Sequence, residues 1–162
     1  MSKEPILETE RLILRPITLD DAKACFSWNS DERVTKYMSY PTLTDISQTI
    51  DWIKSTLTDE KEYNFAFVLK KENKVIGTGS IGPSSKIEGY WGMGYNLHFD
   101  YWHKGYCTEA MKAIIDYVHK ELGVNKICSC HAVDNPRSGK VMEKCGIEKQ
   151  ISYHCARHTF GT

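Results

Sequence analysis

The spacing of hydrophobic residues predicts three amphipathic helices along the chain. Apolar residues recur every three or four positions in segments at about residues 18–29, 46–57 and 108–122. Thr18 suits the N-cap of the first helix, and Thr42 or Thr44 suits that of the second. Gly123 follows the third helix, at the position where a left-handed glycine commonly ends a helix.

Short apolar runs rich in β-branched and aromatic residues predict strands between and beyond these helices. The predicted strands lie at residues 11–15, 65–69, 75–81, 90–99, 126–132 and 147–153. Gly92 and Gly94 interrupt the fourth run, which indicates a bulge or a close approach of the backbone to another group. A fourth helix at about 136–145 is predicted by Asn135 as N-cap, Pro136 in the first turn and Gly146 at its end. The result is an α/β pattern without linkers or repeats, which predicts one domain over residues 1–162.

Composition and charge narrow the class of protein. The 162 residues are 41% hydrophobic and 26% charged, which is typical of a globular domain. Because 21 basic residues balance 21 acidic ones, the chain lacks the positive charge that nucleic-acid binding requires, and we expect no nucleic-acid partner. No apolar run approaches the length that crosses a membrane, and none resembles a signal peptide, so we expect no membrane partner.

The six cysteines are spread over the chain and form no CxxC pair or compact group of ligands. This pattern predicts reduced thiols, no metal site and a location in the cytoplasm.

One segment carries the features of an anion-binding site. Residues 102–108 (WHKGYCT) lead from a predicted strand through a small-residue turn into the third helix. Free N–H groups at a helix N-terminus attract a negative ligand, Gly105 lets the backbone approach it, and Lys104 adds a positive charge. The segment matches neither GxxxxGK[ST] nor GxGxxG, which favours a different phosphate carrier from a nucleoside triphosphate or a dinucleotide. On these grounds alone, an ordinary helix-initiating turn with a chance glycine is an equally good interpretation.

Several segments, taken in order, extend this observation. They are 8–16 (ETERLILRP), 94–97 (GYNL), 101–110 (YWHKGYCTEA), 135–138 (NPRS) and 143–147 (EKCGI). In order and spacing they resemble the GNAT superfamily of N-acetyltransferases, and most closely the branch that includes the ribosomal-protein N-terminal acetyltransferases, RimJ and RimL. The resemblance covers roughly residues 8 to 150. It implies a single-domain GNAT (acyl-CoA N-acyltransferase) fold with a mixed, mostly antiparallel central sheet flanked by helices, and acetyl-CoA as the acetyl donor.

The resemblance also implies where acetyl-CoA binds. In the family, two neighbouring strands separate and the pantetheine arm lies between them; Leu97 and Phe99 match the strand positions whose backbone pairs with its amides. The loop whose N–H groups hold the pyrophosphate is matched by His103, Lys104, Gly105, Tyr106, Cys107 and Thr108. The family's loop pattern of Arg or Gln, two residues, Gly, one residue, and Gly or Ala falls on Trp102, Gly105 and Cys107, so this chain departs from it at the first and last places.

Two residues near the C-terminal end match further functional positions of the family. Asn135 matches an asparagine that contacts the cofactor arm, and its N-cap role is compatible with that contact. Many relatives protonate the departing CoA thiolate with a tyrosine seven residues later, where this chain has Met142. Since methionine has no proton to give, Ser138 is the better candidate for the catalytic acid, with a helix-initiating serine as the equally weighted alternative.

The general base has no clear counterpart in the sequence. Gly92 stands where the branch often carries glutamate, so no carboxylate is carried over. Glu88, Asp100, His98 and His131 lie near the expected cleft, and each is a weaker candidate than a structural role for the same side chain. A relay through water is an equally good interpretation.

The expected reaction is direct transfer of acetyl to a primary amine, without an acyl-enzyme intermediate. The acceptor is either a protein or peptide N-terminus or a small amine such as a polyamine or an aminoglycoside. Loss of catalysis would instead leave an acyl-CoA-binding module, an alternative that Gly92 and the shortened C-terminal region keep open. We expect a monomer or a homodimer.

Overall fold

A computed structural model describes residues 3–36, 38, 40–85 and 87–129 of the chain. In the described part, strands and helices follow one another as a small N-terminal hairpin, a group of helices, three strands, a long helix and a last short strand. The strands are β1 (Leu7–Glu8), β2 (Leu12–Pro16), β3 (Tyr63–Leu69), β4 (Lys74–Pro83), β5 (Trp91–Leu97) and β6 (Ile127–Ser129). The helices are α1 (Ala22–Asn29), α2 (Glu32–Thr35), α3 (Ile46–Thr58) and α4 (Tyr106–Leu122), with 3₁₀ turns η1 (Leu19–Asp21) and η2 (Phe99–Tyr101).

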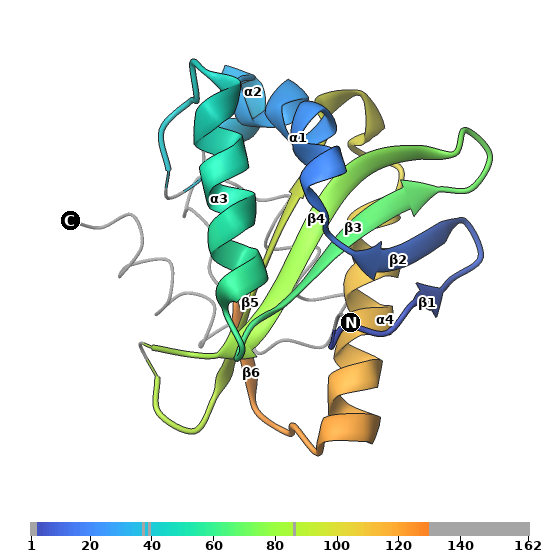
Figure 1. Cartoon of the computed structure of the whole chain (residues 1–162). Coiled ribbons are helices and arrows are strands. Elements are labelled where there is room, and N and C mark those ends of the chain that lie inside the picture. The colour runs from blue at the N-terminus through green and yellow to red at the C-terminus, as the bar shows by residue number, and fades with distance from the viewer. Residues whose placement is uncertain (1–2, 37, 39, 86, 130–162) are drawn as a thin grey trace.

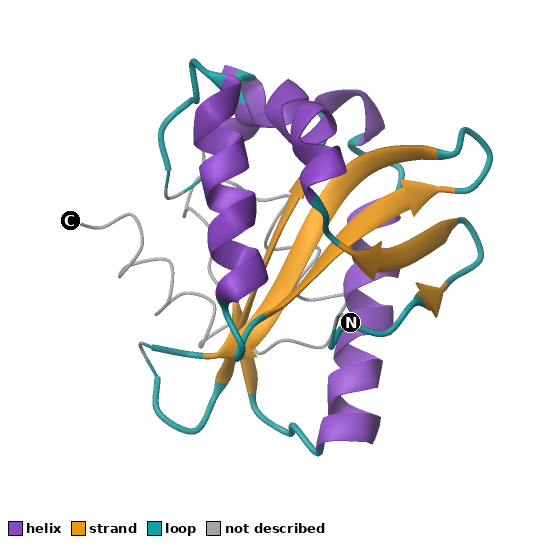
Figure 2. Cartoon of the chain, in the orientation of Figure 1, coloured by secondary structure: helices purple, strands orange, loops and turns teal. Residues whose placement is uncertain are grey.

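These strands form one sheet in the order β1-β2-β3-β4-β5-β6 (Figure 1). Neighbours pair antiparallel except β5 and β6, which are parallel and are joined through α4. A parallel pair requires such a crossover because the chain must return to the same end of the sheet. Helices cover both faces, with α4 opposite α1 and α3 (Figure 2). The predicted mixed, mostly antiparallel sheet flanked by helices is therefore confirmed.

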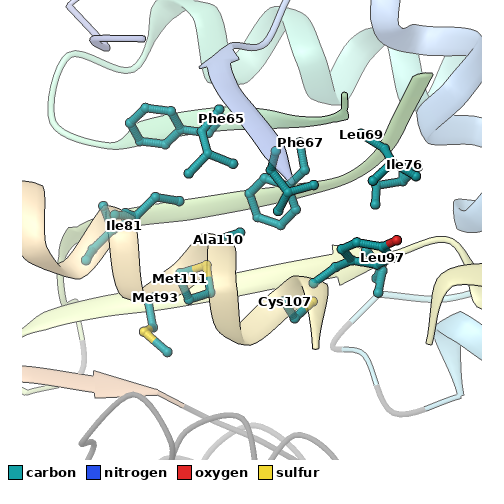
Figure 3. Packing of buried hydrophobic residues seen from close by; sticks show 14 of the residues in the cluster. Phe65, Phe67, Leu69, Ile76, Ile81, Met93, Leu97, Cys107, Ala110 and Met111 are labelled. Carbon is teal, nitrogen blue, oxygen red and sulfur yellow. The ribbon is translucent and has the colours of Figure 1, made fainter. Parts of the chain in front are cut away.

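The larger hydrophobic core lies between the sheet and α4 (Figure 3). Phe65, Phe67 and Met111 are fully buried there. A Cβ atom on Gly79 would lie 2.6 Å from the Phe67 ring and 3.0 Å from the Met111 sulfur, so only glycine leaves room for this packing. The core fixes α4, and with it the segment that begins this helix, against the strands.

The helix starts differ from the predicted ones because of local capping. Residues after Thr18 first form the 3₁₀ turn η1, in which the Asp21 carboxylate accepts a hydrogen bond from the Thr18 N–H, and α1 starts only afterwards. Neither Thr42 nor Thr44 caps α3. Asp45 is the N-cap instead, because its carboxylate accepts from the Ser47 N–H at 2.8 Å.

The strand predicted at residues 90–99 is shorter, since β5 ends at Leu97 and Phe99 lies in the turn η2. The prediction that Phe99 is a strand residue is therefore wrong. The elements β1 and α2 are additional to the predicted ones. The helix predicted at 136–145 and the strand predicted at 147–153 lie outside the described residues. Over the described ranges, no helix is both long and apolar enough to span a membrane.

Candidate functional site

The edge of β5 that faces away from β4 carries the backbone groups of the predicted cofactor site. The His98 N–H donates to the Ile76 carbonyl on the β4 side at 2.8 Å. Peptide groups alternate between the two sides of a strand, so those of Tyr95 and Leu97 point to the opposite side, where β6 lies. The Leu97 N–H therefore points away from β4, to the side on which the predicted pantetheine arm would lie.

The described pairing between β5 and β6 covers all of β6 but only the beginning of β5. The pairs run from Trp91–Ile127 to Met93–Ser129, and the chain beyond Ser129 lies outside the described residues. The Leu97 carbonyl, further along the same edge, accepts a hydrogen bond from the Trp102 indole at 2.9 Å. This contact ties the edge of β5 directly to the start of the predicted anion-binding loop.

The predicted anion-binding loop, residues 102–108, has the backbone shape of an anion site. His103 has φ +65° and Gly105 has φ +81°, and Gly105 is the N-cap of α4. A left-handed residue followed by a right-handed helical one turns successive N–H groups toward one point, which forms a concave site for an anion. His103, Lys104 and Gly105 are exposed, so this part of the loop lies at the protein surface.

The next residues of the loop face the protein interior. Tyr106 and Cys107 are buried, and both belong to the core between the sheet and α4. The Cys107 side chain therefore occupies the core as a small apolar group, where the family usually has Gly or Ala. Thr108 is half-buried in the first turn of α4.

An ion pair lies behind the loop, which sequence reasoning did not single out. Arg11, between β1 and β2, donates through Nε to the Glu109 carboxylate at 2.7 Å and through Nη1 to the Lys104 carbonyl at 2.9 Å. The Thr9 hydroxyl and the Arg11 backbone N–H donate to the other Glu109 oxygen. Burial of Glu109 disfavours its charged form, but hydrogen bonds from Thr9 and Arg11 outweigh this and hold the pKa of Glu109 below its ordinary value.

The candidates for the general base do not form one cluster in the described residues. Glu88 and Asp100 are exposed, and the Nδ1 atom of His98 accepts from the Asp100 N–H at 3.1 Å. Gly92 has open space above it among the described residues, because a Cβ atom there would meet only Ser84, at 3.9 Å. His131 lies outside the described residues, as do the predicted cofactor contact Asn135 and the predicted acid Ser138.

The sheet face beneath α1 and α3 carries neutral polar side chains next to β5. Asn64 and Thr78 are buried there, and the Tyr40 hydroxyl lies 2.8 Å from the Asn96 side-chain oxygen and 3.0 Å from that of Asn29. Burial raises the pKa of the Tyr40 hydroxyl above its ordinary value. The sequence offered only one signal for Tyr40, its position before a proline, which indicates a loop.

Comparison with known proteins shows which family the chain belongs to. A model of the acetyltransferase (GNAT) domain matches residues 11–148. The chain belongs to the GNAT acetyltransferase family. It is 35% identical over 147 residues to an uncharacterized N-acetyltransferase of Bacillus licheniformis, p20, covering 89% of this chain and 83% of that protein. The predicted GNAT fold and N-acetyltransferase activity are thereby confirmed.

Solved structures of other GNAT proteins share the fold. RimL, a ribosomal-protein alpha-N-acetyltransferase in complex with coenzyme A, matches with a TM-score of 0.76 at 15% identity, covering 87% of this chain and 82% of that one. Spermidine N-acetyltransferase from Vibrio cholerae, in complex with CoA and spermine, matches with a TM-score of 0.73 at 19% identity, covering 85% and 81%. Because these two proteins act on different acceptors, the fold alone does not identify the amine.

Proposed function

We propose that this GNAT enzyme binds acetyl-CoA along β5 and the loop 102–108, and transfers the acetyl group directly to a primary amine. The observation that carries the proposal is the left-handed, exposed N-cap Gly105 at the start of α4, a backbone conformation that suits the binding of an anion by N–H groups. Leu97 lies at the end of β5, and the edge of this strand leads from Leu97 back to Met93. We place the pyrophosphate at the loop and the pantetheine arm along this edge.

The reaction requires two proton transfers. The amine nitrogen forms a bond with the acetyl carbon, the bond from that carbon to sulfur breaks, and the amine loses a proton as the thiolate gains one. We assign protonation of the thiolate to Ser138 and contact with the cofactor arm to Asn135, on their match to the family positions. A hydroxyl acid of this kind typically contributes roughly 10²–10⁴ to the rate.

For the acceptor, we favour the α-amine of a protein or peptide N-terminus, as in the RimJ and RimL branch. The described residues on the α1 and α3 face of β3, β4 and β5 include Asn64, Thr78, Ser80 and Asn96, and none of this set is charged. A polyamine would bring several positive charges, which need carboxylates to replace their hydration. A small amine remains the alternative acceptor, and an acyl-CoA-binding module is the alternative without catalysis.

We further propose that residues 1–162 form one domain and that the protein acts in the cytoplasm.

A panel of acceptors is expected to separate these alternatives. Release of CoA thiol from acetyl-CoA is measured with peptides that differ in their first residues, with spermidine and with an aminoglycoside. We expect peptides with a free α-amine to react, and the same peptides with a blocked N-terminus to be inert. A preference for spermidine would overturn the peptide assignment, and CoA binding without turnover of any amine would favour the binding module.

We expect the base to be water rather than His98. The proposed pantetheine arm runs along β5 from Leu97 toward Met93, four residues and about 13 Å away. Because His98 follows Leu97, it lies at the pyrophosphate end of the proposed site, and its Nδ1 atom already accepts a hydrogen bond from the Asp100 N–H.

The pH dependence of kcat/KM tests this assignment. With a water relay, kcat/KM rises with pH until the acceptor amine itself is neutral, and His98→Ala and His131→Ala leave the profile unchanged. A histidine base would instead produce a plateau near pH about 6.5, the ordinary pKa of imidazole. A plateau of that kind, lost in one of the two variants, would identify the base and contradict the water relay.

A further inference from the structure

We propose that Arg11 is a positioning residue for the donor site: paired with Glu109, it fixes the Lys104 carbonyl so that the N–H groups of the loop 102–108 stay turned toward the pyrophosphate. This inference rests on the proposed acetyl-CoA site. It assigns a role to the segment between β1 and β2, which lies far from that site in the sequence.

Three contacts of the Arg11 guanidinium carry the inference. Its Nε atom binds Glu109 and its Nη1 atom binds the Lys104 carbonyl, at 2.7 and 2.9 Å. Its carbon lies 4.3 Å from the centre of the Tyr106 ring, which is buried at the start of α4. The guanidinium thus contacts the residue before Gly105, the residue after it and the first turn of α4, and it spans the turn from behind.

The peptide group that joins Lys104 to Gly105 explains the effect on the ligand. In a trans peptide the carbonyl oxygen and the N–H point in opposite directions, so a carbonyl held by Arg11 directs the Gly105 N–H away from Arg11. The structure contains no cis peptide bond in its described ranges. Orientation of an N–H before the ligand arrives removes part of the ordering cost of binding.

Glu109 holds Arg11 in this position. Its carboxylate receives hydrogen bonds from the Arg11 side chain, the Arg11 backbone and the Thr9 hydroxyl, so both of its oxygens are engaged. A carboxylate in the first turn of α4 would otherwise repel a pyrophosphate at the same helix end. Pairing with Arg11 neutralises that charge, and the planar guanidinium contacts the carboxylate and the carbonyl at once, which a lysine ammonium does not match in geometry.

The test compares two acetyl donors, one with the pyrophosphate and one without it. Acetyl-pantetheine carries the thioester and the pantetheine amides but lacks the pyrophosphate and the nucleotide. We expect Arg11→Lys to lower kcat/KM for acetyl-CoA about tenfold and to leave kcat/KM for acetyl-pantetheine within about twofold. An equal loss with both donors, or no loss with either, would overturn the positioning role.

Arg15→Lys is the matched control. Arg15 lies on β2, and its two terminal nitrogens bind the two Asp21 oxygens at 2.8 and 2.9 Å, on the side of the protein that carries η1 and α1. The substitution weakens a comparable ion pair away from the loop, so we expect the ratio of the two kcat/KM values to stay at the wild-type value. A change in that ratio equal to that of Arg11→Lys would show that general destabilisation causes it.

A charge-balanced double variant separates positioning from neutralisation. Arg11→Met combined with Glu109→Gln removes both charges together and leaves the Lys104 carbonyl without its donor. We expect the selective loss of kcat/KM with acetyl-CoA to persist. If the ratio of kcat/KM for the two donors returned to the wild-type value, Arg11 would act only by neutralising the charge of Glu109. A wild-type enzyme that does not prefer acetyl-CoA over acetyl-pantetheine would instead contradict the proposed pyrophosphate site itself.

Discussion

Replacement of Gly105 by glutamate is expected to lower the affinity for CoA about a hundredfold. The φ angle of +81° costs any residue with a Cβ atom about 1–2 kcal/mol, so the unliganded loop of the variant is expected to relax out of this conformation, and CoA binding must then restore it. A Cβ atom at this position would also lie 3.4 Å from the Arg11 guanidinium. The new carboxylate would stand next to the pyrophosphate, and repulsion between like charges at close range adds at least about 1 kcal/mol. Together these costs reach the roughly 2.7 kcal/mol that a hundredfold change requires.

Calorimetry with CoA measures this effect, and Gly123→Glu provides its control. Gly123 has φ +69° at the opposite end of α4, and a Cβ atom there would meet no atom of the described residues within 4 Å. The control substitution therefore carries a similar backbone cost and the same added charge, away from the loop. Wild-type affinity of Gly105→Glu for CoA would show that the pyrophosphate binds elsewhere.

Replacement of Ser138 by alanine is expected to lower the rate of acetyl transfer by roughly 10²–10⁴, the usual contribution of a general acid. The physical reason is the poor departure of an unprotonated thiolate when no group near it supplies a proton. Affinity for CoA and the melting temperature should change little, because the hydroxyl acts only as the carbon–sulfur bond breaks.

Turnover per folded molecule, measured with saturating acetyl-CoA, decides this prediction. Ser47→Ala is a suitable control, since Ser47 is an exposed serine in the first turn of α3. A Ser138→Ala protein that is less stable but turns over at the wild-type rate would return Ser138 to a purely structural role.

Periodicity predicted the long elements and failed for the short ones. The helices α3 and α4 repeat their apolar stripe over several turns, and both were predicted near their observed positions. The two residues of β1 and the four of α2 are too few to show a period. The cap of α3 was misassigned because threonine and aspartate are both good N-caps. Gln48, whose side chain accepts from the Asp45 N–H, was the signal for Asp45.

In the candidate site, the sequence predicted a feature that depends on neighbouring residues and missed one that depends on residues far apart in the chain. The exposed turn at Lys104 and Gly105 was predictable, because a glycine and a helix start are adjacent in sequence. The pairing of Arg11 with Glu109 joins residues 98 positions apart, and no spacing rule connects them. Phe99 was assigned to a strand because its apolar neighbours continue the strand pattern, whereas the 3₁₀ turn depends on the His98 side chain, which accepts from the Asp100 N–H.

The order of the strands in the sheet also bears on how the protein is made. Each strand from β1 to β5 pairs with the strand next to it in the chain. When synthesis has reached Leu97, five of the six described strands, together with α1 and α3, are therefore already present. The sheet face that packs against α4, with Phe65, Phe67 and Ile81, stays uncovered until α4 is made. A nascent or truncated chain that ends before α4 exposes this aromatic surface, and we expect it to bind chaperones.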